Sequence, residues 1–231
     1  MNKGDRYFNF PISLLKGFMS NTKKVLNDIC DYAIYNHSLK LEYGDELECI
    51  QSSADYYQVK LGNIENSYTN GEEIYYSIDD NSPKVGIDLS IWWDYYKNEK
   101  DDFSKACLLG FLAIKSILQN KAYCKIDNRF WLARMDGRAK SINDVSDLSK
   151  ELQPFSNHYQ TRKIKKELRV HWNLKTYSHY TRGFYVSFQL ELEQLIFEAE
   201  KRRKSTLEKQ HKEREKKARL LALQKLGVSQ P

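Results

Sequence analysis

Hydrophobic residues recur along most of the chain with the spacing of amphipathic helices, which predicts a mainly α fold. The pattern is weakest in residues 63–88, where Asn70-Gly71 is a turn signal, so we expect short helix and loop there. Phe10-Pro11 predicts the start of the first helix, since proline suits a first helical turn. The predicted helices cover about residues 12–37, 45–61, 91–100, 103–120, 128–136, 144–152, 158–172 and 190–226.

Side chains that can cap a helix stand before three of these segments. Asp101-Asp102, Asp127 and Ser156-Asn157 directly precede helices that are predicted to begin near residues 103, 128 and 158. The oxygen of such a side chain accepts a hydrogen bond from a free amide of the first turn. These residues therefore support the predicted helix starts.

The pattern changes from helix to strand in the last third of the chain. Phe184 and Val186 alternate with Tyr185 and Ser187, which is the period of a β-strand. Gly183 comes just before this segment and suits a tight turn. The sequence therefore predicts a β-hairpin, with strands near 174–178 and 184–188.

The net charge of +6 is unevenly distributed. Residues 1–100 hold 10 Lys and Arg against 16 Asp and Glu, whereas residues 121–189 hold 14 against 6 and residues 190–231 hold 11 against 7. A polyanion would bind the basic part, and the acidic part would face solvent or a protein partner. We expect an acidic helical domain over 1–100, a basic domain over 101–189 and a long charged helix over 190–231; the alternative is that both surfaces are merely solvated.

The cysteines do not form a metal-binding pattern. Cys30, Cys49, Cys107 and Cys124 include no C-x-x-C pair, and no histidine pair stands near them at ligand spacing. They are interpreted as reduced thiols of the core. The longest apolar run, 108–114, is far shorter than the roughly 20 residues that span a bilayer. With no apolar signal core at the N-terminus, we expect a soluble, cytoplasmic protein without a membrane contact.

The helix predicted over 158–172 carries the functional hypothesis. On a helical wheel its cations fall within about 100° of one another, and its apolar residues fall opposite. A cationic stripe can contact phosphates, and arginine can also read guanine in the major groove. The alternative is a solvated amphipathic helix. The predicted stripe consists of Arg162, Lys165, Lys166 and Arg169; the opposite side consists of Thr161, Ile164, Leu168 and His171.

Three helices followed by a hairpin form a pattern that resembles the winged helix-turn-helix superfamily, over about residues 103–188. The resemblance is one of pattern and not of a specific motif. It implies a recognition helix in the major groove, with Arg162, Lys165, Lys166 and Arg169 contacting DNA, and a wing over the backbone or minor groove. Residues 139–156 depart from the pattern, because they are long for the turn before a recognition helix. The wing would include Lys175, His179, Tyr180 and Arg182.

A second group of cations lies between the first and second helices of this pattern and extends beyond the second. Tyr123 and Trp131 are interleaved with it. The group would contact phosphates and stack bases, or it would be a helix surface whose arginines pair with Asp127 and Asp136. Both interpretations stay open, and Lys125 and Arg129 are the residues that we assign to the interface. The whole group is Lys121, Lys125, Arg129, Arg134, Arg138 and Lys140.

No catalytic or cofactor motif is present. The chain has no phosphate-binding glycine loop, no dinucleotide fingerprint, no nucleophile elbow and no H-E-x-x-H. We therefore assign no catalytic residue, metal ligand or cofactor, although a site built from distant residues has no signature in sequence. The helix over 190–231 has a basic middle, 200–217, that suits a phosphate-binding arm, a coiled-coil strand or a solvated helix.

Two hypotheses of function result. The first is a nucleic-acid-binding protein, with duplex DNA favoured, that acts as a regulator or a replication-type initiator. The second is a non-enzymatic interaction subunit, whose basic surface meets RNA or an acidic protein. In both, residues 1–100 or 190–231 are the candidate protein contacts, and the terminal helix is a candidate homodimer contact.

Overall fold

The chain folds as a mainly helical protein with two small antiparallel sheets and a long C-terminal helix, which confirms the expected fold class. The computed structural model describes residues 6–42, 44–79, 81–178 and 183–225. One hydrophobic cluster runs from Phe8 to Val186 and so includes residues on both sides of the expected boundary at residue 100. Within the described residues, no helix is both long and apolar enough to cross a membrane.

The N-terminal segment forms a strand that includes Phe10-Pro11, where a helix was expected to begin. β1 (Tyr7–Pro11) alternates buried Phe8 and Phe10 with more accessible Tyr7 and Asn9, and a short 3-10 turn (Ile12–Leu15) follows it. The predicted helix over 12–37 was wrong in its first ten residues, because Gly17 has a φ of +79° and interrupts the chain. α1 (Thr22–Ser38) begins only after this turn.

β1 pairs with a second strand that the sequence did not reveal. β2 (Lys84–Asp88) runs antiparallel to β1, with Tyr7 opposite Asp88 and Pro11 opposite Lys84. This pairing joins the start of the chain to the segment that precedes α4 (Leu89–Lys97). The N-terminal region is therefore not purely helical.

The N-terminal helices pack around α1. α2 (Glu46–Tyr57) agrees with the predicted second helix except at its end, and α3 (Ile64–Ser77) replaces the short helix and loop that were expected over 63–88. The Asn70-Gly71 pair lies inside α3 and not in a turn. The reason is packing: an added Cβ on Gly71 would lie 2.7 Å from the Asp31 carbonyl oxygen of α1.

We predict that Gly71→Ala destabilises the protein by about 1–3 kcal/mol, because the new methyl group overpacks the contact between α1 and α3. This loss opposes the gain that alanine usually brings inside a helix. Urea unfolding measures the change. Gly62→Ala is the control, because no atom lies within 4 Å of its added Cβ. Equal unfolding midpoints for the two variants would contradict the close packing of α1 and α3.

The described part of residues 101–189 contains three α-helices and a three-stranded sheet. The predicted caps are present: Asp101, Asp127 and Asn157 accept hydrogen bonds from first-turn amides. The sheet has the order β3-β5-β4, so the predicted hairpin gains a third strand from the segment between the first two helices. The elements are α5 (Asp102–Leu118), β3 (Cys124–Ile126), α6 (Asn128–Met135), α7 (His158–His171), β4 (Lys175–Tyr177) and β5 (Phe184–Ser187).

The long connection between α6 and α7 is tied to the core. It forms two 3-10 turns, Val145–Asp147 and Gln153–Phe155, and not the helix that was predicted over 144–152. Leu148 and Leu152 are buried, at 4% and 1% exposure. The connection is therefore an integral part of the packing that supports α7.

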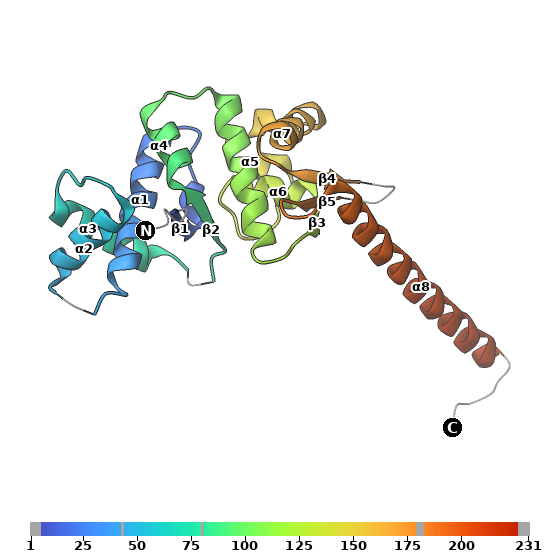
Figure 1. Cartoon of the computed structure of the whole chain (residues 1–231). Coiled ribbons are helices and arrows are strands. Elements are labelled where there is room, and N and C mark those ends of the chain that lie inside the picture. Colours follow the sequence, from blue (N-terminus) through green and yellow to red (C-terminus); the bar gives the residue numbers. More distant parts are fainter. Residues whose placement is uncertain (1–5, 43, 80, 179–182, 226–231) are drawn as a thin grey trace.

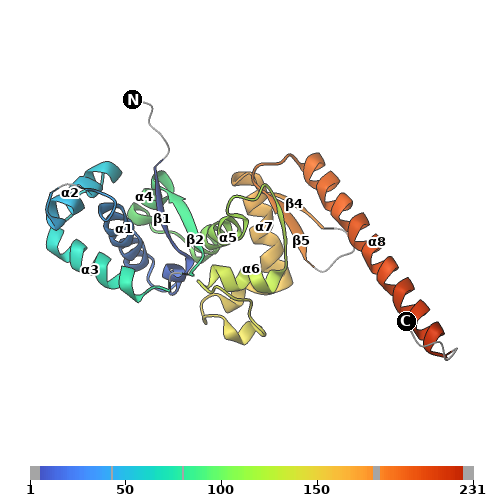
Figure 2. The same ribbon diagram turned by 90° about the horizontal axis from the view of Figure 1, so that it is seen from below.

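The last helix leaves the body of the protein. α8 (Leu192–Lys225) packs on the hairpin through Leu195 and Ala199, which are buried against Tyr185. Beyond that contact it extends away from the other elements, as both views show (Figure 1, Figure 2).

Candidate nucleic-acid interface

α7 packs on α5 through one face and exposes its other face to solvent. Ile164 and Leu168 are fully buried and Thr161 is 2% exposed, as the helical wheel predicted. Gly110 of α5 lies under this contact, since an added Cβ there would be 3.2 Å from Ile164 Cγ2. His171 was expected on the buried side but is exposed, because it stands at the last residue of the helix.

The outer face of α7 is lined by an aromatic ring and four cations. Tyr159 is 71% exposed, and Arg162, Lys166 and Arg169 are exposed as well. In the part of the chain that the structure describes, Arg162, Lys166 and Arg169 take part in no salt bridge. These side chains line a surface groove of about 610 Å³. The cationic strip, as we name it, consists of Tyr159, Arg162, Lys163, Lys166 and Arg169.

Two members of the cationic strip were missed from the sequence. Lys163 and Tyr159 were not assigned, although they stand four residues apart and share a helix face with Lys166. The ammonium of Lys163 lies 4.2 Å from the centre of the Phe103 ring, so this side chain also crosses to the start of α5. The spacing of residues 159, 163 and 166 was the signal that could have found them.

Lys165 is separated from the other three residues of the predicted stripe. Its Nζ donates a hydrogen bond to Asn128 Oδ1 at 2.7 Å and lies 3.7 Å from the centre of the Phe184 ring. Burial lowers the pKa of Lys165 to about 8, and nearby Arg169 contributes to the decrease. The reason is geometric: at 3.6 residues per turn, Lys165 is only about 40° from buried Thr161.

Lys165 faces a cleft under the hairpin. This hairpin cleft has a volume of about 350 Å³ and lies between the starts of α6 and α7 and the two strands β4 and β5. Asn128 and His158 are the first residues of their helices, and Thr176 and Ser178 contribute hydroxyl groups. Such a mixture of donors around an ammonium suits an oxyanion.

The wing residues are only partly described. Lys175 of β4 is half-buried, and its Nζ donates to Asn173 Oδ1 at 2.7 Å and lies 3.8 Å from Glu191 Oε2. Its charge is therefore partly neutralised within the protein. His179, Tyr180 and Arg182 lie outside the described residues.

The second group of cations, between Lys121 and Lys140, has some members that are exposed and others that are paired or buried. Lys125 of β3 and Arg129 of α6 are exposed, and both remain available for a phosphate. Arg138 pairs with Asp136 at 2.9 Å, which agrees with the interpretation of a paired helix surface. Arg134 is 7% exposed and stacks over the Phe130 ring at 4.9 Å. Trp131 is fully buried and cannot stack a base.

The described residues show no metal centre and no disulfide. They contain no group of three or more His, Cys, Asp and Glu that could hold a metal ion. Cys30, Cys49 and Cys107 are buried, and burial raises the pKa of the Cys30 and Cys107 thiols. The described side chains of the interface offer charge, hydrogen bonding and aromatic contact.

No family model, no curated protein and no solved structure matches this chain.

Proposed function

We propose that this protein binds nucleic acid, with duplex DNA favoured, through the cationic strip of α7 and the neighbouring hairpin. The observation that carries the proposal is the free charge of Arg162, Lys166 and Arg169, which lie on successive turns of a helix whose opposite face is buried. Three cations that make no salt bridge within the described residues can bind phosphates, whereas cations of an ion-paired surface are already neutralised.

The order of elements supports a winged-helix module. α5, α6 and α7 are followed directly by the β4–β5 hairpin, which is the arrangement that the resemblance requires. The long segment before α7 stays a departure from that pattern, but its buried Leu148 and Leu152 attach it beside α7 without covering the cationic strip. In this proposal α7 is the recognition helix and the hairpin is the wing.

The contacts divide into two kinds. Arg162, Lys166 and Arg169 would bind phosphates or the edges of bases, and exposed Tyr159 would stack on a sugar or base at the end of the helix. Lys125, Arg129 and Lys165 would hold the backbone beside the wing. A regulator or a replication-type initiator is the role that fits such a module joined to an acidic N-terminal half.

A titration of the whole protein against duplex DNA, single-stranded DNA and structured RNA tests the proposal. With about four phosphate contacts, affinity for the duplex should fall about a hundredfold between 50 and 200 mM salt. The expected order is duplex before single strand before RNA. Failure to bind all three at the lowest salt would overturn the proposal.

A second candidate function, an interaction subunit, is favoured by α8. Phe197 is 67% exposed and Leu207 is 53% exposed, on a helix that leaves the body of the protein (Figure 1). Exposed apolar residues on a protruding helix suit contact with a protein, including a second copy of this chain. The two candidates are compatible, because α8 starts beside the hairpin and extends away from it.

A further inference from the structure

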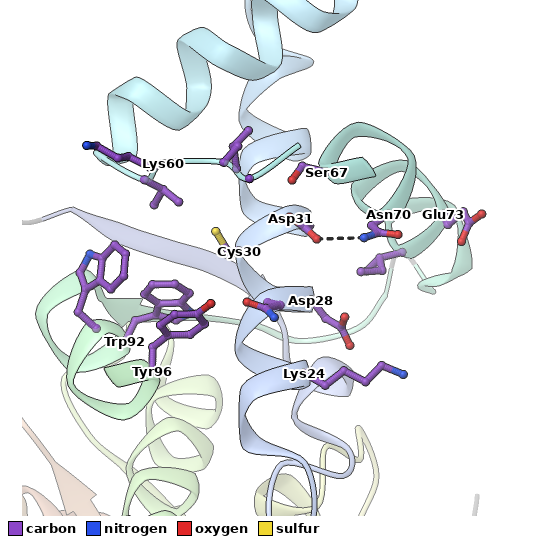
Figure 3. Close-up of a pocket in the computed structure, with 16 residues that line it drawn as sticks. Lys24, Asp28, Cys30, Asp31, Lys60, Ser67, Asn70, Glu73, Trp92 and Tyr96 are labelled. Atoms are coloured by element: carbon purple, nitrogen blue, oxygen red, sulfur yellow. Dashed lines mark hydrogen bonds between the residues drawn. The ribbon is translucent and has the colours of Figure 1, made fainter. Parts of the chain in front are cut away.

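The acidic half contains a cleft with a volume of about 690 Å³. It lies between α1, α3 and α4 (Figure 3). α1 contributes Asp28 and Asp31, α3 contributes Glu73, and α4 contributes Trp93 and Tyr96. Its volume is in the range of pockets that hold small ligands. The carboxylates and the rings come from different helices, so the fold alone brings them together.

Asp31 is a half-buried carboxylate that makes no salt bridge in the part of the chain that the structure describes. The Asn70 side-chain amide donates to Asp31 Oδ2 over a long distance of 3.5 Å. Among the described residues, no lysine or arginine forms a salt bridge with Asp28, Asp31 or Glu73. Burial raises the pKa of Asp31 to about 6, and hydrogen bonds from Asn70 and Ser67 offset only part of that rise. A cation in the cleft would supply the missing charge compensation.

The two lysines that line the cleft, Lys24 and Lys60, do not neutralise the charge of Asp31. The ammonium groups of Lys24 and Lys60 lie towards opposite edges of the view, whereas Asp31 lies between them (Figure 3). Lys24 is close enough to Asp28 to lower the pKa of that carboxyl, although burial raises it more. The centre of the cleft therefore keeps an excess of negative charge.

Aromatic rings complete the cleft opposite the carboxylates. The Trp92 and Tyr96 rings are stacked, with centroids 4.8 Å apart and an angle of 12° between planes. Trp92 is fixed, because its Nε1–H donates to the Leu26 carbonyl oxygen at 3.0 Å. Lys97 already lies over Trp93, 4.6 Å from the ring centroid, so Tyr96 is the ring that we assign to a ligand. An aromatic face attracts a cation and packs against methylene groups.

We propose that this cleft binds an organic cation, with a guanidinium or alkylammonium group neutralised by Asp31 and Asp28 and an aliphatic stem packed on Tyr96. An anion would meet uncompensated carboxylates, and a neutral ligand would leave Asp31 without a counter-charge. The proposal does not depend on nucleic-acid binding, since the cleft and the cationic strip share no residue.

The ligand charge is tested with a matched pair of small molecules. N-butylguanidine and its neutral isostere N-butylurea differ in charge and hardly in shape. An NMR titration of the whole labelled protein should give about tenfold tighter binding of the guanidine, as loss of one charge-assisted hydrogen bond implies. A synthetic peptide of residues 200–217, the basic part of α8, is titrated in parallel. Tighter binding of the peptide would identify a protein side chain as the source of the cation.

The affinity for the guanidine should increase as the pH rises. The guanidinium stays charged from pH 5 to pH 8, so a change in affinity over this range comes from titration of the protein. Asp31 is mostly protonated at pH 5 and ionised at pH 8, so affinity should rise about tenfold from pH 5 to pH 8. The charged or titratable groups that line the cleft with Asp31 are Lys24, Asp28 and Cys30 on α1, Glu73 on α3, Lys60 before α3 and Tyr96 on α4. Burial also raises the pKa of Asp28 and of Cys30.

The variant test uses Asp31→Asn, which keeps the shape of the side chain and removes its charge. We expect it to lose both the preference for the guanidine over the urea and the pH dependence. Asp55→Asn is the control, because it removes an exposed charge on α2 that does not line the cleft. Equal binding of guanidine and urea, or an unchanged preference in Asp31→Asn, would overturn the proposal. If Asp31→Asn does not fold, a wild-type affinity that stays constant from pH 5 to pH 8 would overturn it as well.

Discussion

Replacing Arg162, Lys166 and Arg169 together with alanine should weaken duplex binding by about a hundredfold in low salt, with the fold intact. All three side chains are exposed and make no salt bridge within the described residues, so their loss removes charge without breaking a contact of the core. Each lost phosphate contact should also reduce the slope of log affinity against log salt by about 1. Fluorescence anisotropy across a salt series measures both quantities, and circular dichroism checks the helix content.

A matched triple variant separates a local contact from net charge. Lys23→Ala, Lys40→Ala and Lys84→Ala also remove three exposed cations, but from the acidic half of the chain. That variant should keep nearly the full affinity and the full salt slope. If the two triple variants lose the same affinity, binding depends on overall charge and α7 is not the recognition helix.

Trp131→Ala should lower the free energy of unfolding by about 3–5 kcal/mol, which is typical of truncating a buried aromatic side chain. Trp131 is fully buried between α5, α7 and the sheet, and its Nε1–H donates to the Gly110 carbonyl oxygen at 3.0 Å. Its removal breaks that hydrogen bond and leaves a cavity under Phe184, whose ring centroid is 6.1 Å away. Thermal unfolding should show a fall of roughly 10 °C in Tm.

Trp131→Phe distinguishes packing from recognition. It keeps most of the buried ring and loses the hydrogen bond, so we expect about half the destabilisation or less. Nucleic-acid affinity, measured well below the Tm, should be nearly that of the wild type in Trp131→Phe. A Trp131→Ala protein as stable as the wild type would contradict the buried position of Trp131.

The helices around the interface were predicted well because their signals are local. Asp101, Asp127 and Asn157 each cap a helix from the residue next to it, and the period of Phe184 and Val186 identifies a strand without outside information. Pairings between distant segments have no such signal. β1 and β2 are separated by more than seventy residues. β3 pairs with β5, although α6 and α7 lie between the two strands in the sequence.

The interface was predicted in outline and not in detail. A helical wheel does not distinguish one cation from another on the same face. It therefore cannot show that Phe184 of the hairpin packs over Lys165, whereas Arg162 and Lys166 stay exposed. The cleft of the acidic half could not be predicted, because Asp31 and Tyr96 stand 65 positions apart and meet only through packing. Asn70-Gly71 was misleading for a related reason, since its glycine serves a helix contact and not a turn.

α8 is held to the sheet by two hydrogen bonds close to its start. Tyr123 donates to Glu198 at 3.2 Å and Tyr177 donates to Glu200 at 2.8 Å, so we expect the helix to move with the sheet as a rigid lever. From Glu200 to Lys225 the lever is about 38 Å long, and a tilt of about 10° at the hairpin would displace its end by about 7 Å. In the proposed complex with DNA, a small adjustment of the β4–β5 hairpin would therefore become a large displacement at the far end of the helix.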